Sequence, residues 1–286
     1  MDTLPDRNNF LVETDWLADR LGAADLAIID ASWHMPHTGR SGRDEFSQAH
    51  IPGAVFFDID AIADPSTGLP HMLPGPEAFA EAAGALGLGD DMDLVVYDSA
   101  GLFSAARVWW MLKIMGGPLV RVLNGGLPKW RTEGLALETG TAKPTQRIFT
   151  CKPTLDRVRD MEQMHHHSTT GDAVIVDARA PGRFQGTAPE PRPELPSGHI
   201  PGSKNVPFTA LVNPDGTMKS TAEMAEIFTA AGVEITQPVV TTCGSGVTAA
   251  VLTLGLSILG ARDLALYDGS WSEWGAGDPA RISTGA

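Results

Sequence analysis

Residues 50–54 read HIPGA, and the same pattern returns as HIPGS at residues 199–203. Each copy follows a short apolar run that ends in aspartate, AIID at residues 27–30 and VIVD at residues 174–177. Two later pairs of segments recur in the same order, residues 94–97 with 239–242 and residues 122–130 with 266–274. Four matches with nearly the same offset indicate two copies of one domain.

The apolar runs are short and continuous, as parallel strands are when helices cover both faces of their sheet. Helical segments separate these runs in each copy. The sequence therefore predicts an α/β fold of two tandem domains, each a central, mostly parallel sheet flanked by helices. The polar, proline-containing stretch TAKPTQRIFTCKP has no helical period and is typical of a linker. We place the first domain at residues 1–140, the linker at residues 141–155 and the second domain at residues 156–286.

Composition limits the possible partners and compartments. A net charge of −14 over 286 residues argues against nucleic acid, whose phosphates an acidic protein repels. Two cysteines do not make a disulfide framework and fit a reducing compartment. The N-terminal residues lack the apolar centre of a signal peptide, and the apolar stretch 249–259 is too short to span a bilayer. We expect a cytoplasmic protein without a membrane partner.

Cys243 lies in the stretch TTCGSGVTAA, between a β-branched strand and an apolar helix. A free cysteine is usually a small core residue. At such a hinge, however, backbone N–H groups and the start of the next helix favour an anion. No lysine or arginine occurs in residues 243–261, so amides and the helix dipole must stabilise a thiolate within this loop. Cys151 lies in the linker and is interpreted as a bystander.

The paired HIPG motifs, the strands that end in Asp-Ala-Ser or Asp-Ala-Arg, and the cysteine loop resemble the tandem rhodanese family over nearly the whole chain. The loop CGSGVT is similar to that of the branch that uses 3-mercaptopyruvate, whereas the thiosulfate branch carries basic residues after its cysteine. The resemblance implies a sulfurtransferase, an enzyme that moves sulfur from mercaptopyruvate to a thiol or cyanide through a Cys243 persulfide. Pyruvate is then released.

The resemblance also implies the roles of other residues. The glycines and prolines of the stretch GRFQGTAPEPR predict a loop, and two arginines in a loop suit an anionic substrate. The stretch is similar to the family segment whose arginines, here Arg183 and Arg192, bind the carboxylate and keto group of mercaptopyruvate. Asp60 and His71 in the first copy follow the order found in the mercaptopyruvate branch. They are expected to polarise Ser245 as a proton is delivered to the enolate of pyruvate. The remaining expected substrate contacts are loop residues, namely Gly244, Gly246, Val247 and Thr248.

Alignment of the two copies places Asp98 where the second copy has Cys243. A carboxylate cannot hold transferable sulfur, so the first loop is expected to be catalytically inactive. The first domain is expected to lend residues to a cleft between the domains, because such clefts are favoured ligand sites.

Other functions remain open. Thiosulfate is the nearest alternative donor, although a dianion would favour more positive charge than this loop holds. A phosphatase on the same fold needs an arginine near position 247, and a non-catalytic binding module has no need of an intact Cys243 loop. The histidine run 165–167 and the pair His34 and His37 lack ligands at a recognised spacing, so we expect no metal and no cofactor. The acceptor, a small thiol or a thioredoxin-like protein, is not indicated by the sequence.

Overall fold

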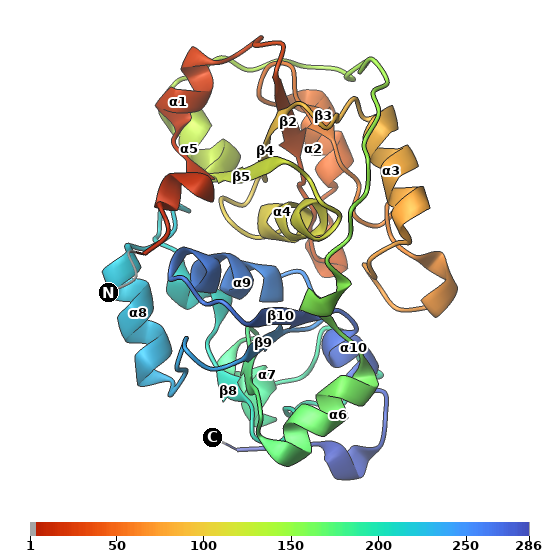
Figure 1. Cartoon of the computed structure of the whole chain (residues 1–286), viewed down its shortest axis with the longest axis vertical. Coiled ribbons are helices and arrows are strands. Elements are labelled where there is room, and N and C mark those ends of the chain that lie inside the picture. The colour runs from red at the N-terminus through yellow and green to blue at the C-terminus, as the bar shows by residue number, and fades with distance from the viewer. Residues whose placement is uncertain (1–3, 286) are drawn as a thin grey trace.

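The structure is a computed structural model that describes residues 4–285 of the chain. Its strands form two five-stranded, fully parallel sheets with equivalent orders, β1-β5-β4-β2-β3 and β6-β10-β9-β7-β8. Figure 1 shows the two copies one above the other, each with helices around its sheet. The predicted α/β fold of two tandem domains is confirmed.

Domain 1 carries the first sheet and domain 2 carries the second. The strands of domain 1 are β1 (Leu11–Val12), β2 (Leu26–Asp30), β3 (Val55–Phe56), β4 (Asp93–Tyr97) and β5 (Leu119–Leu123). Its α-helices are α1 (Thr14–Asp19), α2 (Gly42–Gln48), α3 (Pro76–Ala85), α4 (Ala105–Ile114) and α5 (Gly126–Thr132). The strands of domain 2 are β6 (Val158–Arg159), β7 (Val174–Asp177), β8 (Lys204–Asn205), β9 (Val239–Thr242) and β10 (Leu264–Tyr267). Its α-helices are α6 (Met161–Thr170), α7 (Pro181–Gln185), α8 (Thr221–Ala230), α9 (Ala249–Ile258) and α10 (Ser270–Trp274).

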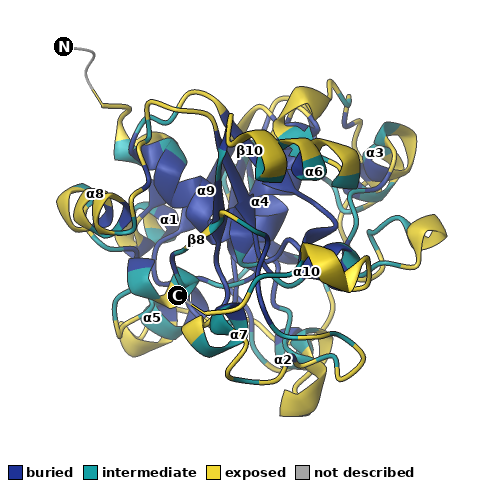
Figure 2. Cartoon of the chain, turned by 90° about the horizontal axis from the view of Figure 1, so that it is seen from below, coloured by how far each residue is buried: buried dark blue, intermediate teal, exposed yellow. Residues whose placement is uncertain are grey.

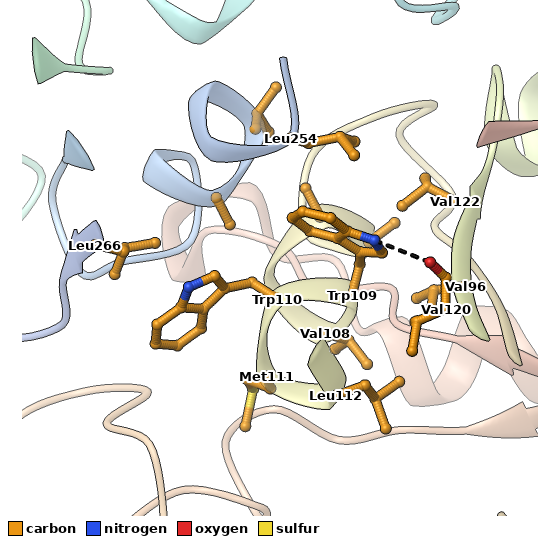
Figure 3. Close-up of a cluster of buried hydrophobic side chains, with 14 of the residues drawn as sticks. Val96, Val108, Trp109, Trp110, Met111, Leu112, Val120, Val122, Leu254 and Leu266 are labelled. Atoms are coloured by element: carbon orange, nitrogen blue, oxygen red, sulfur yellow. Dashed lines mark hydrogen bonds between the residues drawn. The ribbon is translucent and has the colours of Figure 1, made fainter. Parts of the chain in front are cut away.

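Helices α4 and α9 pack against each other between the two sheets (Figures 1 and 2). Apolar neighbours surround these helices, so every residue of α4 is buried except Lys113 and every residue of α9 is buried except Ser257. In Figure 3, Trp109 of α4 lies beside Leu254 of α9, and its indole N–H donates to the carbonyl of Val120 at 3.1 Å. One hydrophobic core therefore runs through both domains.

The segment predicted as a linker is extended and packs against domain 1. Phe149 is buried and contacts Phe79, with ring centroids 5.7 Å apart. The amides of Lys152 and Thr154 donate to the carbonyls of Met115 and Ile114 at 2.9 and 2.8 Å. These contacts hold the connection in place along domain 1 up to the 3₁₀ helix Leu155–Arg157, just before β6.

The repeated HIPG motif has a structural role in both copies. The His50 ring stacks on Phe46 and the His199 ring stacks on Phe184, each with centroids 3.9 Å apart. Each histidine Nδ1 also lies within hydrogen-bonding distance of the carbonyl oxygen of that same phenylalanine. This shared geometry makes Phe46 and Phe184 equivalent, and it aligns α2 with α7.

Each domain also reaches over the loop of the other. The Leu73 amide of domain 1 donates to Asp268 Oδ2 of domain 2 at 2.7 Å, and the Met218 amide of domain 2 donates to Asn124 Oδ1 of domain 1 at 2.8 Å. Gly216 fits against Gly101 so closely that a Cβ added to Gly216 would lie 3.0 Å from the Gly101 Cα. The two interdomain contacts are related by the same repeat as the sheets. In residues 4–285, no helix is both long and apolar enough to traverse a bilayer.

Candidate active site

The cysteine loop connects β9 to α9, and the start of α10 fixes its shape. Cys243 is 2% exposed. The Ser270 hydroxyl accepts hydrogen bonds from the amides of Cys243 and Gly246 at 3.2 and 3.1 Å, and donates to the carbonyl of Tyr267 at 2.9 Å. The Trp271 amide donates to the Cys243 carbonyl at 2.9 Å. The loop is therefore held by a hydroxyl that sequence reasoning did not single out.

The amides of Ser245, Thr248 and Ala250 have no hydrogen-bond acceptor within the part of the chain that the structure describes. In domain 1 the equivalent amides, those of Ala100, Phe103 and Ala105, all donate to the Asp98 carboxylate at 2.8 Å. The same backbone thus binds an anion in one copy and surrounds the Cys243 side chain in the other. Amides arranged in this way stabilise a thiolate or a persulfide anion.

His71 comes from domain 1 and lies against the cysteine loop of domain 2. Its Nδ1 is 3.0 Å from Ser245 Oγ, and its Nε2 is 3.0 Å from Asp60 Oδ1. The Trp33 indole donates to Asp60 Oδ2 at 2.9 Å and packs edge-on against the His71 ring. The hydrogen bond from His71 is the main cause that lowers the pKa of Asp60, so this carboxylate stays ionised in mildly acidic solution. The structure brings together the three residues predicted as a proton-transfer chain.

The backbone of His71 is held in an unusual conformation by a buried interdomain ion pair. His71 has a φ of 63°, a left-handed value that residues other than glycine rarely adopt. Arg107 of α4 is fully buried and donates to the His71 carbonyl, and its Nη1 lies 2.7 Å from Asp268 Oδ1. Gly246 is required beside this pair, because a Cβ there would lie 2.7 Å from Arg107 Nη1. Arg107 and Asp268 were not predicted from the sequence, since the functional loop contains neither.

Arg183 lies on the short helix α7. The prediction of a loop from its glycine- and proline-rich surroundings is therefore wrong at this position. Pro181 fits the first turn of a helix, and Gly186 with a φ of 79° ends it, so these residues delimit a helix here. The Arg183 guanidinium pairs with buried Glu190, with Nε 3.0 Å from Oε1. A Cβ on Gly244 would lie 3.1 Å from Arg183 Nη2, which puts this cation directly beside the cysteine loop.

Arg192 is partly exposed, and its guanidinium has no hydrogen-bond or ion-pair partner among residues 4–285. Its positive charge contributes to the lowered pKa of Asp60, so it lies toward the His71 side of the site. The two predicted arginines therefore lie at separate positions, Arg183 beside Gly244 of the cysteine loop and Arg192 near Asp60. Arg192 is the one that has no carboxylate partner of its own.

A third arginine, Arg179 of the Asp-Ala-Arg motif after β7, also lies near the cysteine. Arg179 is buried, stacks over the Trp271 ring at 4.0 Å, and pairs with Asp177 and Glu190. Burial alone would lower the pKa of Arg179, but Asp177, Glu190 and Cys243 raise it overall. Positive charge thus reaches the loop from a neighbouring strand end, although the loop itself contains none.

The remaining predicted residues are placed less directly. The Val247 side chain is 3% exposed and belongs to the hydrophobic core, so its backbone is the part available to a substrate. His34 pairs with Glu45, and His166 and His167 pair with Asp172. Within the described residues, no group of three or more histidine, cysteine, aspartate or glutamate side chains is arranged to hold a metal ion.

Comparisons with known proteins agree with this architecture. Residues 13–133 and residues 160–276 each match the model of the rhodanese-like domain. The chain belongs to the rhodanese-like family. This confirms the resemblance to tandem rhodaneses that the repeated motifs indicated.

Individual relatives match this rhodanese over most of its length. A 3-mercaptopyruvate sulfurtransferase of Escherichia coli (strain K12) is 45% identical, with 93% of this chain and 95% of that protein covered. An Arabidopsis thaliana protein named thiosulfate/3-mercaptopyruvate sulfurtransferase 2 is 43% identical over 93% of this chain and 84% of its own. The crystal structure of SseA from Escherichia coli, a 3-mercaptopyruvate sulfotransferase, superposes with a TM-score of 0.85 at 43% identity. That match covers 92% of this chain and 99% of that one.

Proposed function

We propose that this rhodanese is a sulfurtransferase that takes sulfur from 3-mercaptopyruvate, forms a persulfide on Cys243, and passes the sulfur to a thiol or to cyanide. The observation that carries this proposal is the chain Asp60–His71–Ser245, which ends beside the cysteine loop. A donor whose carbon skeleton leaves as a carbanion needs such a source of protons, whereas thiosulfate, which leaves as sulfite, does not. The names of the similar proteins support the same donor.

Binding of the donor follows from the charges around the loop. Arg192 has no carboxylate partner in the described structure and is free to bind the carboxylate of mercaptopyruvate through two parallel hydrogen bonds. Arg183 lies beside Gly244 and is held by Glu190, so it offers its remaining N–H groups to the keto oxygen. These contacts orient the sulfur of the donor toward Cys243.

Transfer begins when the Cys243 thiolate attacks the donor sulfur. A sulfur–sulfur bond forms, and the bond between sulfur and the methylene carbon breaks. The electron pair of that bond remains on carbon as the enolate of pyruvate, and Cys243 carries the persulfide S–SH. The free amides of Ser245, Thr248 and Ala250 stabilise the negative charge of the Cys243 thiolate before this step.

The enolate then takes a proton from the Ser245 hydroxyl, and the imidazolium form of His71 replaces that proton through Nδ1 and later regains one from solvent. Asp60 accepts the hydrogen bond of Nε2, which orients the ring and stabilises this imidazolium form. In the second half of the reaction, an acceptor thiolate attacks the outer sulfur. The sulfur–sulfur bond breaks, the acceptor leaves as its persulfide, and the Cys243 thiolate is regenerated.

The test compares two donors on one enzyme. Pyruvate release from mercaptopyruvate and sulfite release from thiosulfate are measured with cyanide as the common acceptor. We expect kcat/KM for mercaptopyruvate to exceed that for thiosulfate by more than ~10-fold, since the loop lacks the cations that favour a dianion. A preference for thiosulfate would overturn the choice of donor, and the Arabidopsis relative named for both donors makes this the relevant alternative.

The physiological acceptor and the compartment remain predictions. A thioredoxin-like protein is tested as acceptor by following its persulfide after transfer from loaded enzyme, against a small thiol at equal concentration. Cytoplasmic location is tested by fractionation of the source cells.

A further inference from the structure

A cavity lies at the domain interface, at the ends of α4 and α9 that point away from the cysteine loop. Its volume is ≈950 Å³, and its apolar wall includes Phe10, Trp109, Ile114 and Leu259. Domain 1, the end of the linker and domain 2 all contribute to it. Arg107, which holds His71, precedes Lys113 by six residues on α4, or about 9 Å along the helix axis. The cavity is thus separate from the site at Cys243.

Among the residues that the structure describes, the charged side chains that line this cavity are all positive. Lys113, Arg157 and Arg262 line it, and no aspartate or glutamate is among its described lining residues. The side chains of Lys113 and Arg157 have no hydrogen-bond or ion-pair partner within residues 4–285. This is unusual in a chain of net charge −14, in which carboxylates are abundant.

Lys113 and Arg157 also lie close enough to affect each other. Burial is the main cause that lowers the pKa of Lys113, and the positive charge of Arg157 lowers it further. Lys113 comes from α4 of domain 1, and Arg157 ends the 3₁₀ helix that leads into domain 2. Two like charges that face each other without a counterion repel, and an anion placed between them removes that repulsion.

We propose that this cavity binds a small amphipathic anion, an aromatic or medium-chain carboxylate or sulfonate. The acidic group lies between Lys113 and Arg157, and the apolar part packs against Phe10 and Trp109. The volume falls in the range of small-molecule sites, and the combination of an apolar wall with a few convergent polar groups is typical of them. Because the ligand contacts both domains in their docked arrangement, its binding stabilises the folded protein.

The probe is 8-anilinonaphthalene-1-sulfonate, titrated by fluorescence into the full chain. We expect saturable binding at one site, weakened at least ~10-fold by either Lys113→Glu or Arg157→Glu, since each removes a charge-assisted contact and adds repulsion. Lys204→Glu is the matched control, because Lys204 is exposed on β8 and its replacement changes the net charge equally. Octanoate is expected to displace the probe, whereas 1-octanol at the same concentration is not.

Three outcomes would overturn the proposal: unchanged binding in both cavity variants, equal displacement by octanol and octanoate, or an equal loss of binding in Lys204→Glu. Near-UV circular dichroism and a cooperative melt establish that each variant is folded. If a charge reversal prevents folding, Lys113→Gln and Arg157→Gln carry the test, with several-fold weakening expected and wild-type binding contradicting the proposal. Sulfur transfer without the probe is expected to be the same in all variants, so this test does not depend on the proposed function.

Discussion

The loop after β4 and the loop after β9 have the same backbone pattern in two copies of one fold, but their interiors hold different groups. In domain 1 the Asp98 carboxylate is fully buried and accepts three amide hydrogen bonds. In domain 2 the equivalent amides have no protein acceptor among the described residues, and Cys243 lies where Asp98 would be. The loop of domain 1 is therefore filled by a side chain of its own, whereas the loop of domain 2 can stabilise an anion that changes during a reaction.

The surroundings of the two loops differ as much as their centres. Ala100 occupies the position of Ser245, and Glu45 of α2 occupies that of Arg183 of α7. Glu45 is paired with Arg40 and His34, and these hydrogen bonds lower its pKa to about 2. Gly216, with a φ of 82°, occupies the position of His71. The two loops therefore differ at four equivalent positions and not only at the cysteine.

The largest effect is expected from the cysteine itself. Cys243→Ser should lower pyruvate release more than ~10³-fold, because a serine hydroxyl is neither ionised nor able to accept sulfur. Cys151→Ser is the control and should change turnover little. Intact-mass analysis after donor without acceptor should show one added sulfur, located on Cys243. Asp98→Cys in the Cys243→Ser background should not restore turnover, and a restored rate would show that the loop centre alone decides activity.

The next largest effect is expected at His71, whose equivalent in the other copy is Gly216. His71→Ala should lower kcat about 10²-fold with a small change in KM, because proton delivery matters only as the enolate forms. Asp60→Asn should act in the same direction more weakly, since Asp60 orients His71 and stabilises its imidazolium form but transfers no proton itself. A change confined to KM in both variants would remove these residues from the proton-transfer chain.

The arginines are expected to act on binding. Arg192→Ala should raise KM for mercaptopyruvate by roughly 10- to 100-fold with kcat nearly constant, as expected for the loss of a charged contact present in both ground and transition states. Arg183→Ala should raise KM at least as much, and it also leaves Glu190 buried with only Arg179 as a partner. Steady-state kinetics with mercaptopyruvate measure both. An unchanged KM in Arg192→Ala would place the donor carboxylate elsewhere.

A smaller effect, on stability, should come from the loop of domain 1. Asp98→Asn keeps the shape of the side chain but replaces a charged acceptor of three amides, so the free energy of unfolding should fall by about 1–3 kcal/mol. Urea unfolding measures this loss. At temperatures where the variant is folded, kcat should equal that of wild type. A loss of kcat without a loss of stability would mean that the domain 1 loop takes part in the reaction.

The last prediction concerns the pH dependence of stability, which should depend on Asp30 at the end of β2 and not on the equivalent Asp177 at the end of β7. Burial raises the pKa of Asp30 to about 6, whereas the equivalent Asp177 has Arg179 as an ion-pair partner. A raised pKa means that folding favours the protonated carboxyl. This contribution is fully present below pH ~4 and is lost as the pH rises through 6, with a slope near 1 kcal/mol per unit. Denaturation between pH 4 and 7 should show this slope in wild type and not in Asp30→Asn. An equal slope in the variant would assign it to another group.

The repeat made much of the fold predictable, because apolar strands and HIPG motifs are local patterns that occur twice. The cysteine loop was predictable for the same reason, since strand, glycines and helix are contiguous. Arg107 and Asp268 were not, because they meet only after the domains dock. Trp33 was not, because it contacts Asp60 from 27 residues away within domain 1. The helical position of Arg183 was missed because proline and glycine, which suggest a loop, here begin and end a single short helix.

A segment of each domain packs over the loop of the other domain, so the order in which the domains are synthesised matters. A chain leaves the ribosome from its N-terminus, and domains generally fold in that order. Domain 1 emerges with its own loop already filled by Asp98 and with His71 on the segment that will face the second copy. The reactive cysteine is made last, and it meets its histidine only when α9 docks against α4. In the proposed mechanism, the final docking step of folding is therefore also the step that completes the catalyst, and a half-made chain lacks the histidine–cysteine arrangement that sulfur transfer uses.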